Sequence, residues 1–209
     1  MYLFTRSWRV DPEHIVKGLE WTGEITETGR KITGLQIDAW NAVLSPELGT
    51  VVWTLWSESI AEIQRAGDAL MSDAGYLKAV EKGADYFDGQ AADGLATLVH
   101  GELNRDDNSF EYVGVATATA ANGRLQDAAA AGIEIADHVT KVTGDTTLFI
   151  VNTTGPFGGC AWITPNADAA ALDAGEAALM ADAEWLPLLD RVGTAYVNDA
   201  AQAIFRRLA

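Results

Sequence analysis

The side chains that could bind or transform a small molecule lie mainly on the first two predicted strands. Residues 2–10 and 35–44 alternate in character along the chain, so each strand presents two different faces. The candidates are Phe4, Arg6 and Trp8 on one face of the first strand, Asp38 and Trp40 on one face of the second, and Asn41 on its other face. Ligand pockets combine large apolar walls with a few charged or amide groups that fix orientation. This set therefore predicts a site for a small hydrophobic or aromatic molecule.

The elements that position these residues occur twice. Residues 1–100 align with residues 111–209 at a shift of about 110 positions, and the order of the matches is preserved along the whole chain. We predict two equivalent repeats, residues 1–101 and 110–209, joined by a polar, turn-rich linker at 102–109. Units of about 100 residues bury a small fraction of their surface when alone, which favours two units that share an interior.

The repeats differ where the chemistry is expected. The strand face that carries Phe4, Arg6 and Trp8 is matched in the second repeat by three small residues, Gly114, Ala116 and Ala118. Polar groups in one repeat and vacated volume in the other predict one asymmetric pocket. Two structural alternatives stay open: Trp8 fills the space that the small residues leave, and Arg6 forms an ion pair with Asp38.

Each repeat reads as strand, helix, strand, strand, helix, strand. In the first repeat we expect a helix from Asp11-Pro12 to Thr28 that Gly29 ends, and a last strand at 95–99. In the second repeat we expect a helix at 123–139 and a long helix, capped by Asn166 or Asp168, that continues through Pro187. The predicted fold class is therefore α+β, with two tandem ferredoxin-like repeats.

Two short segments then point to a known superfamily. Asp73-Ala-Gly-Tyr76-Leu77 and Asp182-Ala-Glu-Trp185-Leu186 each combine a helix break with an aromatic residue. They resemble the Asp-Pro-Glu-aromatic stretch of NIPSNAP-type and antibiotic-biosynthesis-monooxygenase-type members of the dimeric α+β barrel superfamily, with alanine in place of proline. The resemblance implies an intramolecular barrel and a small molecule bound between sheet and helices.

The resemblance implies an enzyme hypothesis and leaves others open. A cofactor-independent monooxygenase or isomerase would use Arg6, Asp38, Asn41 and His100 to orient or deprotonate the substrate, between walls formed by Phe4, Trp8 and Trp40. The competing hypothesis is a non-catalytic assembly or carrier protein. A third is haem binding, because chlorite dismutases and dye-decolourising peroxidases are duplicated members of the superfamily. The haem ligand would then be His138, which otherwise suits the end of a helix electrostatically.

Composition narrows the partners and the compartment. The net charge is −16, and it is spread over both halves, −7 for the first 105 residues and −9 for the rest. Basic doublets occur only at Arg30-Lys31 and Arg206-Arg207, which disfavours nucleic acid and anionic membranes as partners. One cysteine, Cys160, and no signal-like segment predict a cytoplasmic protein. The scattered histidines predict no metal site and no cofactor, and assembly into a homo-oligomer stays open.

Overall fold

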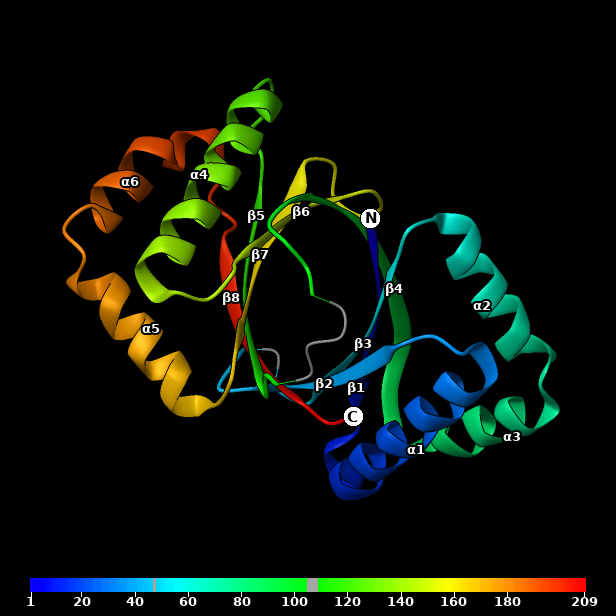
Figure 1. Cartoon of the computed structure of the whole chain (residues 1–209). Helices are drawn as coiled ribbons and strands as arrows, with labels where there is room; N and C mark the ends of the chain where they lie inside the picture. The colour runs from blue at the N-terminus through cyan, green and yellow to red at the C-terminus, as the bar shows by residue number, and fades with distance from the viewer. Residues whose placement is uncertain (47, 105–108) are drawn as a thin grey trace. The chain divides into compact units, whose positions relative to one another are not determined.

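The structure is a computed structural model that describes residues 1–46, 48–104 and 109–209 (Figure 1). The chain divides into two compact units. Unit 1 comprises Met1–Leu95 and Arg206–Ala209, and unit 2 comprises Ala96–Phe205. The predicted linker at 102–109 falls partly on residues 105–108, which lie outside the described residues, so the repeat boundaries stay a prediction.

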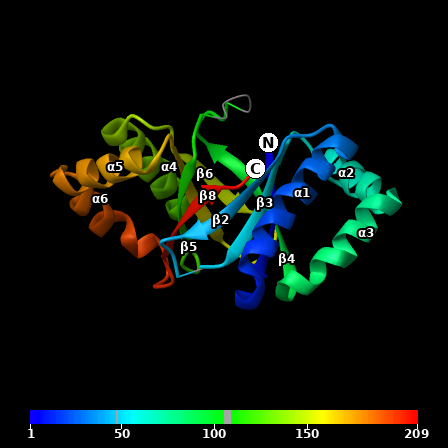
Figure 2. The same ribbon diagram turned by 90° about the horizontal axis from the view of Figure 1, so that it is seen from below.

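Unit 1 is a sheet with helices on one face. Its strands are β1 (Tyr2–Val10), β2 (Ile37–Val43), β3 (Thr50–Ser57) and the first part of β4 (Phe87–His100). Its helices are α1 (Ile15–Thr33), α2 (Ile60–Ser72) and α3 (Ala74–Gly83), with 3-10 turns at Pro12–His14 and Ala84–Tyr86. The strand order is β4-β1-β3-β2, and α1 packs beside α2 and α3 (Figure 2).

Unit 2 repeats this arrangement. Its strands are β5 (Tyr112–Thr119), β6 (Leu148–Asn152), β7 (Gly159–Asn166) and most of β8 (Ala201–Arg207). Its helices are α4 (Leu125–Thr143), α5 (Ala169–Ala181) and α6 (Trp185–Val192), followed by a 3-10 turn at Gly193–Ala195. The order β8-β5-β7-β6 matches that of unit 1 position by position. Both units therefore have the predicted β-α-β-β-α-β topology.

The eight strands form one hydrogen-bonded series, β1-β3-β2-β8-β5-β7-β6-β4, which closes into a barrel. The strand pairs β1/β3, β2/β3, β5/β7, β6/β7 and β4/β6 are all antiparallel. The predicted α+β barrel is therefore confirmed.

The first helix of each unit is longer than the sequence predicts. Gly29 does not end α1, because it lies within the helix and gives room to Ile37 of β2. The helix ends instead at Gly34, which has a φ of 70° and donates its backbone N–H to the carbonyl of Arg30. Gly144 ends α4 in the same left-handed conformation, with a φ of 84°.

The fourth strand and the last long helix also differ from expectation. β4 begins at Phe87, eight residues before the predicted start, and its positive φ at Gly89 lies within the strand. The predicted helix through Pro187 is interrupted, because α5 ends at Ala181 and α6 begins at Trp185. Asp168 caps α5, since its side chain accepts the backbone N–H of Ala171.

Each unit has its own apolar core between sheet and helices. In unit 1, Val10, Trp21, Ile25, Val51 and Phe87 are buried together, and Trp8 and Trp53 pack against them. In unit 2, Phe149 of β6 and Trp162 of β7 lie at the centre, with ring centroids 5.3 Å apart. Trp162 donates its indole N–H to the carbonyl of Gly132 at 2.8 Å, which fixes α4 on the sheet. This packing positions the α4 side chains that form the site described next.

Candidate functional site

The predicted residues of β1 face the helices of unit 1. Trp8 stacks on Phe87 with ring centroids 4.6 Å apart, and its indole N–H donates to the carbonyl of Gly89. Phe4 and Arg6 share this face, because alternate residues of a strand point the same way. The ring of Trp8 therefore belongs to the aromatic core of unit 1.

Arg6 does not pair with Asp38. Its Nε and Nη2 donate to the two carboxylate oxygens of Asp93, at 2.7 and 2.8 Å, so that alternative is wrong. The hydrogen bond that Arg6 donates to Asp93 raises the pKa of Arg6, and burial raises the pKa of the nearby Tyr76 phenol. The Arg6 and Asp93 side chains are about half exposed. The structure thus gives Arg6 a carboxylate partner that sequence reasoning missed, because the expected strand began after Asp93.

The predicted residues of β2 are divided between the two faces of the sheet. Asp38 and Trp40 pair in register with Thr54 and Val52, so they lie on the face opposite Arg6, whose register partner is Trp53. Asp38 accepts hydrogen bonds from Arg30 and from Gln36, at 3.3 and 2.7 Å.

Trp40 and Asn41 have different surroundings. Trp40 donates its indole N–H to the Thr54 hydroxyl, and the Arg207 guanidinium lies 4.9 Å from its ring centroid. Asn41 lies on the helix-facing side, and its buried Oδ1 has no hydrogen-bond partner among the described residues. The β2 candidates therefore do not converge with Arg6 on one point.

The small residues of β5 face the core of unit 2. Ala118 is 7% exposed and belongs to the buried cluster around Phe149 and Trp162. Ala116 packs against the same cluster, and a side chain built at Gly114 would meet only the Thr164 carbonyl, at 3.9 Å. At Ala118 the volume is occupied by neighbouring rings, which favours packing as the reason for a small residue there.

His100, the fourth predicted catalytic residue, lies in unit 2. Its Nε2 is 2.7 Å from a carboxylate oxygen of Asp137 on α4. The four predicted catalytic residues thus occupy separate surroundings, and a role for any of them in substrate binding or catalysis stays a prediction. Asp137 also belongs to a second group of candidate residues, which line a pocket beside α4.

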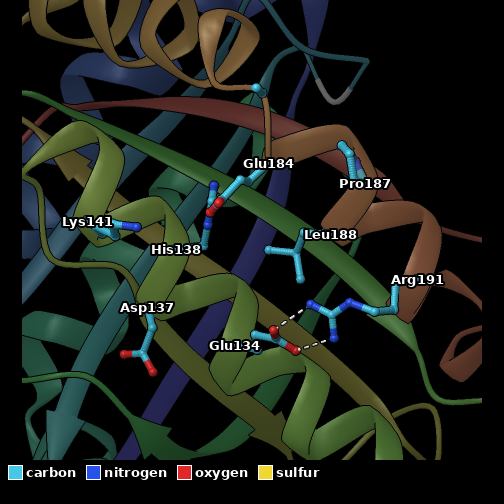
Figure 3. Close-up of a pocket in the computed structure, with 9 residues that line it drawn as sticks. Glu134, Asp137, His138, Lys141, Glu184, Pro187, Leu188 and Arg191 are labelled. Carbon is cyan, nitrogen blue, oxygen red and sulfur yellow. Dashed lines mark hydrogen bonds and ion pairs between the residues drawn. The ribbon is translucent and has the colours of Figure 1, made fainter.

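An open pocket of about 560 Å³ lies between α4 and α6 (Figure 3). Its wall combines charged side chains with an apolar floor. The lining residues are Glu134, Asp137, His138, Lys141, Ala183, Glu184, Pro187, Leu188 and Arg191. The volume falls in the usual range for small-molecule sites, about 300–1,000 Å³.

His138 is the residue in this pocket best suited to acid–base chemistry. Its side chain is 11% exposed, its ring stacks on Trp185 with centroids 5.8 Å apart, and its Nε2 lies 3.1 Å from Oδ1 of Asp182. A carboxylate and an aromatic ring therefore hold the imidazole in place. This is the arrangement that fixes a histidine's tautomer and orientation.

The charge state of Asp182 decides which nitrogen of His138 is basic. Burial acts to raise the pKa of Asp182, but hydrogen bonds from the Glu184 backbone N–H and from His138 outweigh it, so the pKa lies below its usual value. An ionised carboxylate can only accept, so Nε2 of His138 carries the proton. Nδ1 is then the basic nitrogen of the neutral ring, and it has no hydrogen-bond partner within the described ranges.

The second charged contact of the pocket joins its two helices. Arg191 of α6 donates from Nη1 and Nη2 to both carboxylate oxygens of Glu134 on α4, at 3.0 and 2.6 Å. The pairing lowers the pKa of Glu134 and raises that of Arg191. Lys141, one turn beyond His138 on α4, makes no ion pair with the described residues. Two cations therefore flank the imidazole along the pocket.

Part of this site was visible in the sequence. The Asp182-to-Trp185 segment marks a helix break, and its first residue holds His138 while its last stacks on the same ring. The matched position in unit 1 is Thr28, whose hydroxyl donates to the Glu24 carbonyl within the same helix. A comparison of the repeats along the helices as well as the strands would have singled out His138 as a base, where sequence reasoning considered it only for haem.

Metal-binding clusters and membrane-spanning helices are both absent from the described ranges. No cluster of three or more His, Cys, Asp or Glu side chains that could hold a metal ion occurs there. No helix of the described chain is both long and apolar enough to cross a bilayer.

Solved structures identify the fold. A "Putative monooxygenase" from Fusobacterium nucleatum subsp. nucleatum has a TM-score of 0.74 and 8% identity, covering 100% of this chain and 92% of that one. An "anthrone oxidase-like protein" has a TM-score of 0.67 and 10% identity, and the match covers 99% of this chain and 90% of that one. A "putative monooxygenase" from Lactobacillus acidophilus has a TM-score of 0.65 and 6% identity, and the match covers 100% of this chain and 94% of that one. No protein-family model and no curated protein matches the chain. The resemblance to the dimeric α+β barrel superfamily is thus confirmed at the level of fold.

Proposed function

We propose that this protein binds a small aromatic molecule in the α4/α6 pocket and removes a proton from one of its carbon atoms. The observation that carries the proposal is the Asp182–His138–Trp185 contact at the pocket wall. A general base must be held in one tautomer and in one orientation. Asp182 and Trp185 supply both conditions to His138.

Binding would place the flat apolar part of the substrate along Leu188 and Pro187, which line the pocket. Nδ1 of His138 would then accept the proton, and the imidazolium formed would be stabilised by Asp182 through the Nε2–H hydrogen bond. The remaining carbanion is delocalised into the aromatic system as an enolate. The residues of this chain thus supply binding, orientation and one proton transfer.

The fate of the enolate separates two reaction types. Reaction with dioxygen converts a CH2 group to a carbonyl, one oxygen atom entering the product and the other leaving as water, which is a monooxygenase reaction. Return of the proton to another carbon gives an isomerase. The names of two structural neighbours, a "Putative monooxygenase" and an "anthrone oxidase-like protein", support testing the oxygenase branch first, with anthrone as the substrate.

The experiment measures oxygen uptake with anthrone in wild type and in His138→Gln. Positioned general bases contribute about 10²–10⁴-fold to rate, so the variant should lose activity by that factor. Asp182→Asn should also lose activity, whereas Asp73→Asn, the matched change in unit 1, should not. An unchanged rate in His138→Gln would contradict the proposal. Binding of aromatic ligands without turnover in wild type would favour the alternative of a carrier protein.

A further inference from the structure

Arg191 is the basic residue in the last turn of α6, and its counterpart in the first repeat is a lysine. The helices end at Gly83 in α3 and at Val192 in α6, so the matched residue in unit 1 is Lys82, while the partner Glu134 is matched by another acid, Glu24. The two repeats have the same topology, so packing of the fold does not require an arginine at this position. The arginine occurs in the repeat that also carries His138, and both side chains line the same pocket.

The contacts of Arg191 leave it able to bind a second anion. A guanidinium has five N–H groups in a fixed plane, and the bidentate contact with Glu134 uses two of them. The remaining three include Nε–H, and none of them has a partner among the described residues. The Arg191 side chain is 60% exposed, so these donors reach the pocket and solvent. Figure 3 shows the guanidinium held at one end of the pocket, across from Glu134.

The spacing along α4 relates this cation to the proposed base. Glu134, which holds Arg191, precedes His138 by four residues, about 6 Å along the helix axis. A ligand that contacts both side chains would place an oxygen at Arg191 and a carbon at Nδ1 of His138. Removal of a proton by His138 moves negative charge to that oxygen, where a positioned cation stabilises it.

We infer that Arg191 forms an oxyanion-binding site in the α4/α6 pocket, which takes the phenolate or enolate oxygen of an aromatic ligand. Its place in the reaction rests on the proposed function, but its binding chemistry does not. Three carboxylates also line the pocket: Glu134 is occupied by Arg191, Asp137 by His100, and Glu184 remains. A direct guanidinium contact with an oxyanion is a short, charge-assisted hydrogen bond, so it favours the anion at this end of the pocket.

The test uses 4-nitrophenol, whose phenolate absorbs visible light and whose phenol does not. Wild type should bind the phenolate preferentially, so the apparent pKa of the bound probe should fall. Arg191→Gln should weaken phenolate binding about ten- to a hundredfold, as expected for the loss of a charge-assisted hydrogen bond. Arg191→Lys should retain part of the affinity, and Arg65→Gln, an equal charge change on an exposed part of α2, should have no effect.

A second variant separates ligand binding from a structural role. Glu134→Gln keeps Arg191 and removes its competing carboxylate, so it should bind the phenolate at least as tightly as wild type. If both Glu134→Gln and Arg191→Gln lost binding equally, the ion pair would merely hold α4 to α6, and the inference would be overturned. Preference of wild type for the neutral phenol would overturn it too. The proposed function would fail separately, through full anthrone turnover in His138→Gln.

Discussion

The contact between Gly132 and Phe149 positions the helix that carries His138, and it gives a quantitative prediction. A Cβ atom at Gly132 would lie 2.1 to 2.6 Å from three ring carbons of Phe149, whose side chain is 1% exposed. Gly132→Ala should therefore be destabilising, although alanine favours a helix by about 1 kcal/mol over glycine. Overpacking a core costs about 1–3 kcal/mol, and a well-buried ring cannot easily move away.

The second variant removes the ring. Phe149→Ala should lower the free energy of unfolding by about 3–5 kcal/mol, since it leaves a cavity next to Trp162. In the double variant the new methyl group no longer meets a ring, partly fills the cavity and adds its helix preference. We therefore expect the double variant to be as stable as Phe149→Ala or about 1 kcal/mol more stable. The coupling free energy between the two sites is then about 1–3 kcal/mol, the cost of overpacking that the ring causes.

Urea unfolding followed by tryptophan fluorescence measures all four proteins, with Gly23→Ala as the control. Gly23 also lies within a first helix, α1, but a Cβ there would meet nothing within 4 Å. That change should be neutral or stabilising. Strictly additive effects at Gly132 and Phe149 would refute the reasoning, because they would mean that the ring does not pack on the glycine.

Three further predictions follow from burial and charge. Burial raises the pKa of the Cys160 thiol to about 11, so the native protein should resist alkylation by iodoacetamide at pH 8 until urea exposes the thiol. Above pH 9 the wild type should lose stability relative to Cys160→Ala, because only the thiol of the unfolded chain ionises there. Because the pKa of Asp182 is lowered in the folded protein, its ionised form stabilises the fold at neutral pH. The difference in unfolding free energy between wild type and Asp182→Asn should therefore shrink as pH falls below about 4, and a constant difference would contradict this. Ala118→Trp should lower the melting temperature sharply, because Ala118 is 7% exposed within a filled core; an unchanged value would reveal a cavity there.

Local signals allowed much of the fold to be predicted from the sequence. The alternation of residues 2–10 predicted β1, and Asp168, one of two cap candidates, predicted the start of α5, because an N-cap depends on residues two or three positions away. The prediction that Gly29 ends α1 is wrong. A glycine suits both close packing and a left-handed helix end, and only the tertiary structure decides between them.

The candidate site was less predictable, since its contacts join distant parts of the chain. Arg6 meets Asp93 across 87 positions, and His138 meets Asp182 across 44. The sequence shows that each residue is charged or titratable, but it does not show which partner the fold brings to it. Asp182 and Trp185 were recognised as a helix break, and their contact with His138 depends on the angle at which α6 returns to α4.

The most direct test of the account is the loss of deuterium from the methylene carbon of labelled anthrone, measured without oxygen. Under these conditions only the proposed proton abstraction occurs, so neither oxygen chemistry nor product release affects the rate. We predict that wild type accelerates the exchange above the buffer rate and that His138→Gln reduces this acceleration by about 10²–10⁴-fold, while Asp73→Asn retains it. Equal exchange by wild type and His138→Gln, or no acceleration by wild type, would contradict the assignment of His138 as the base.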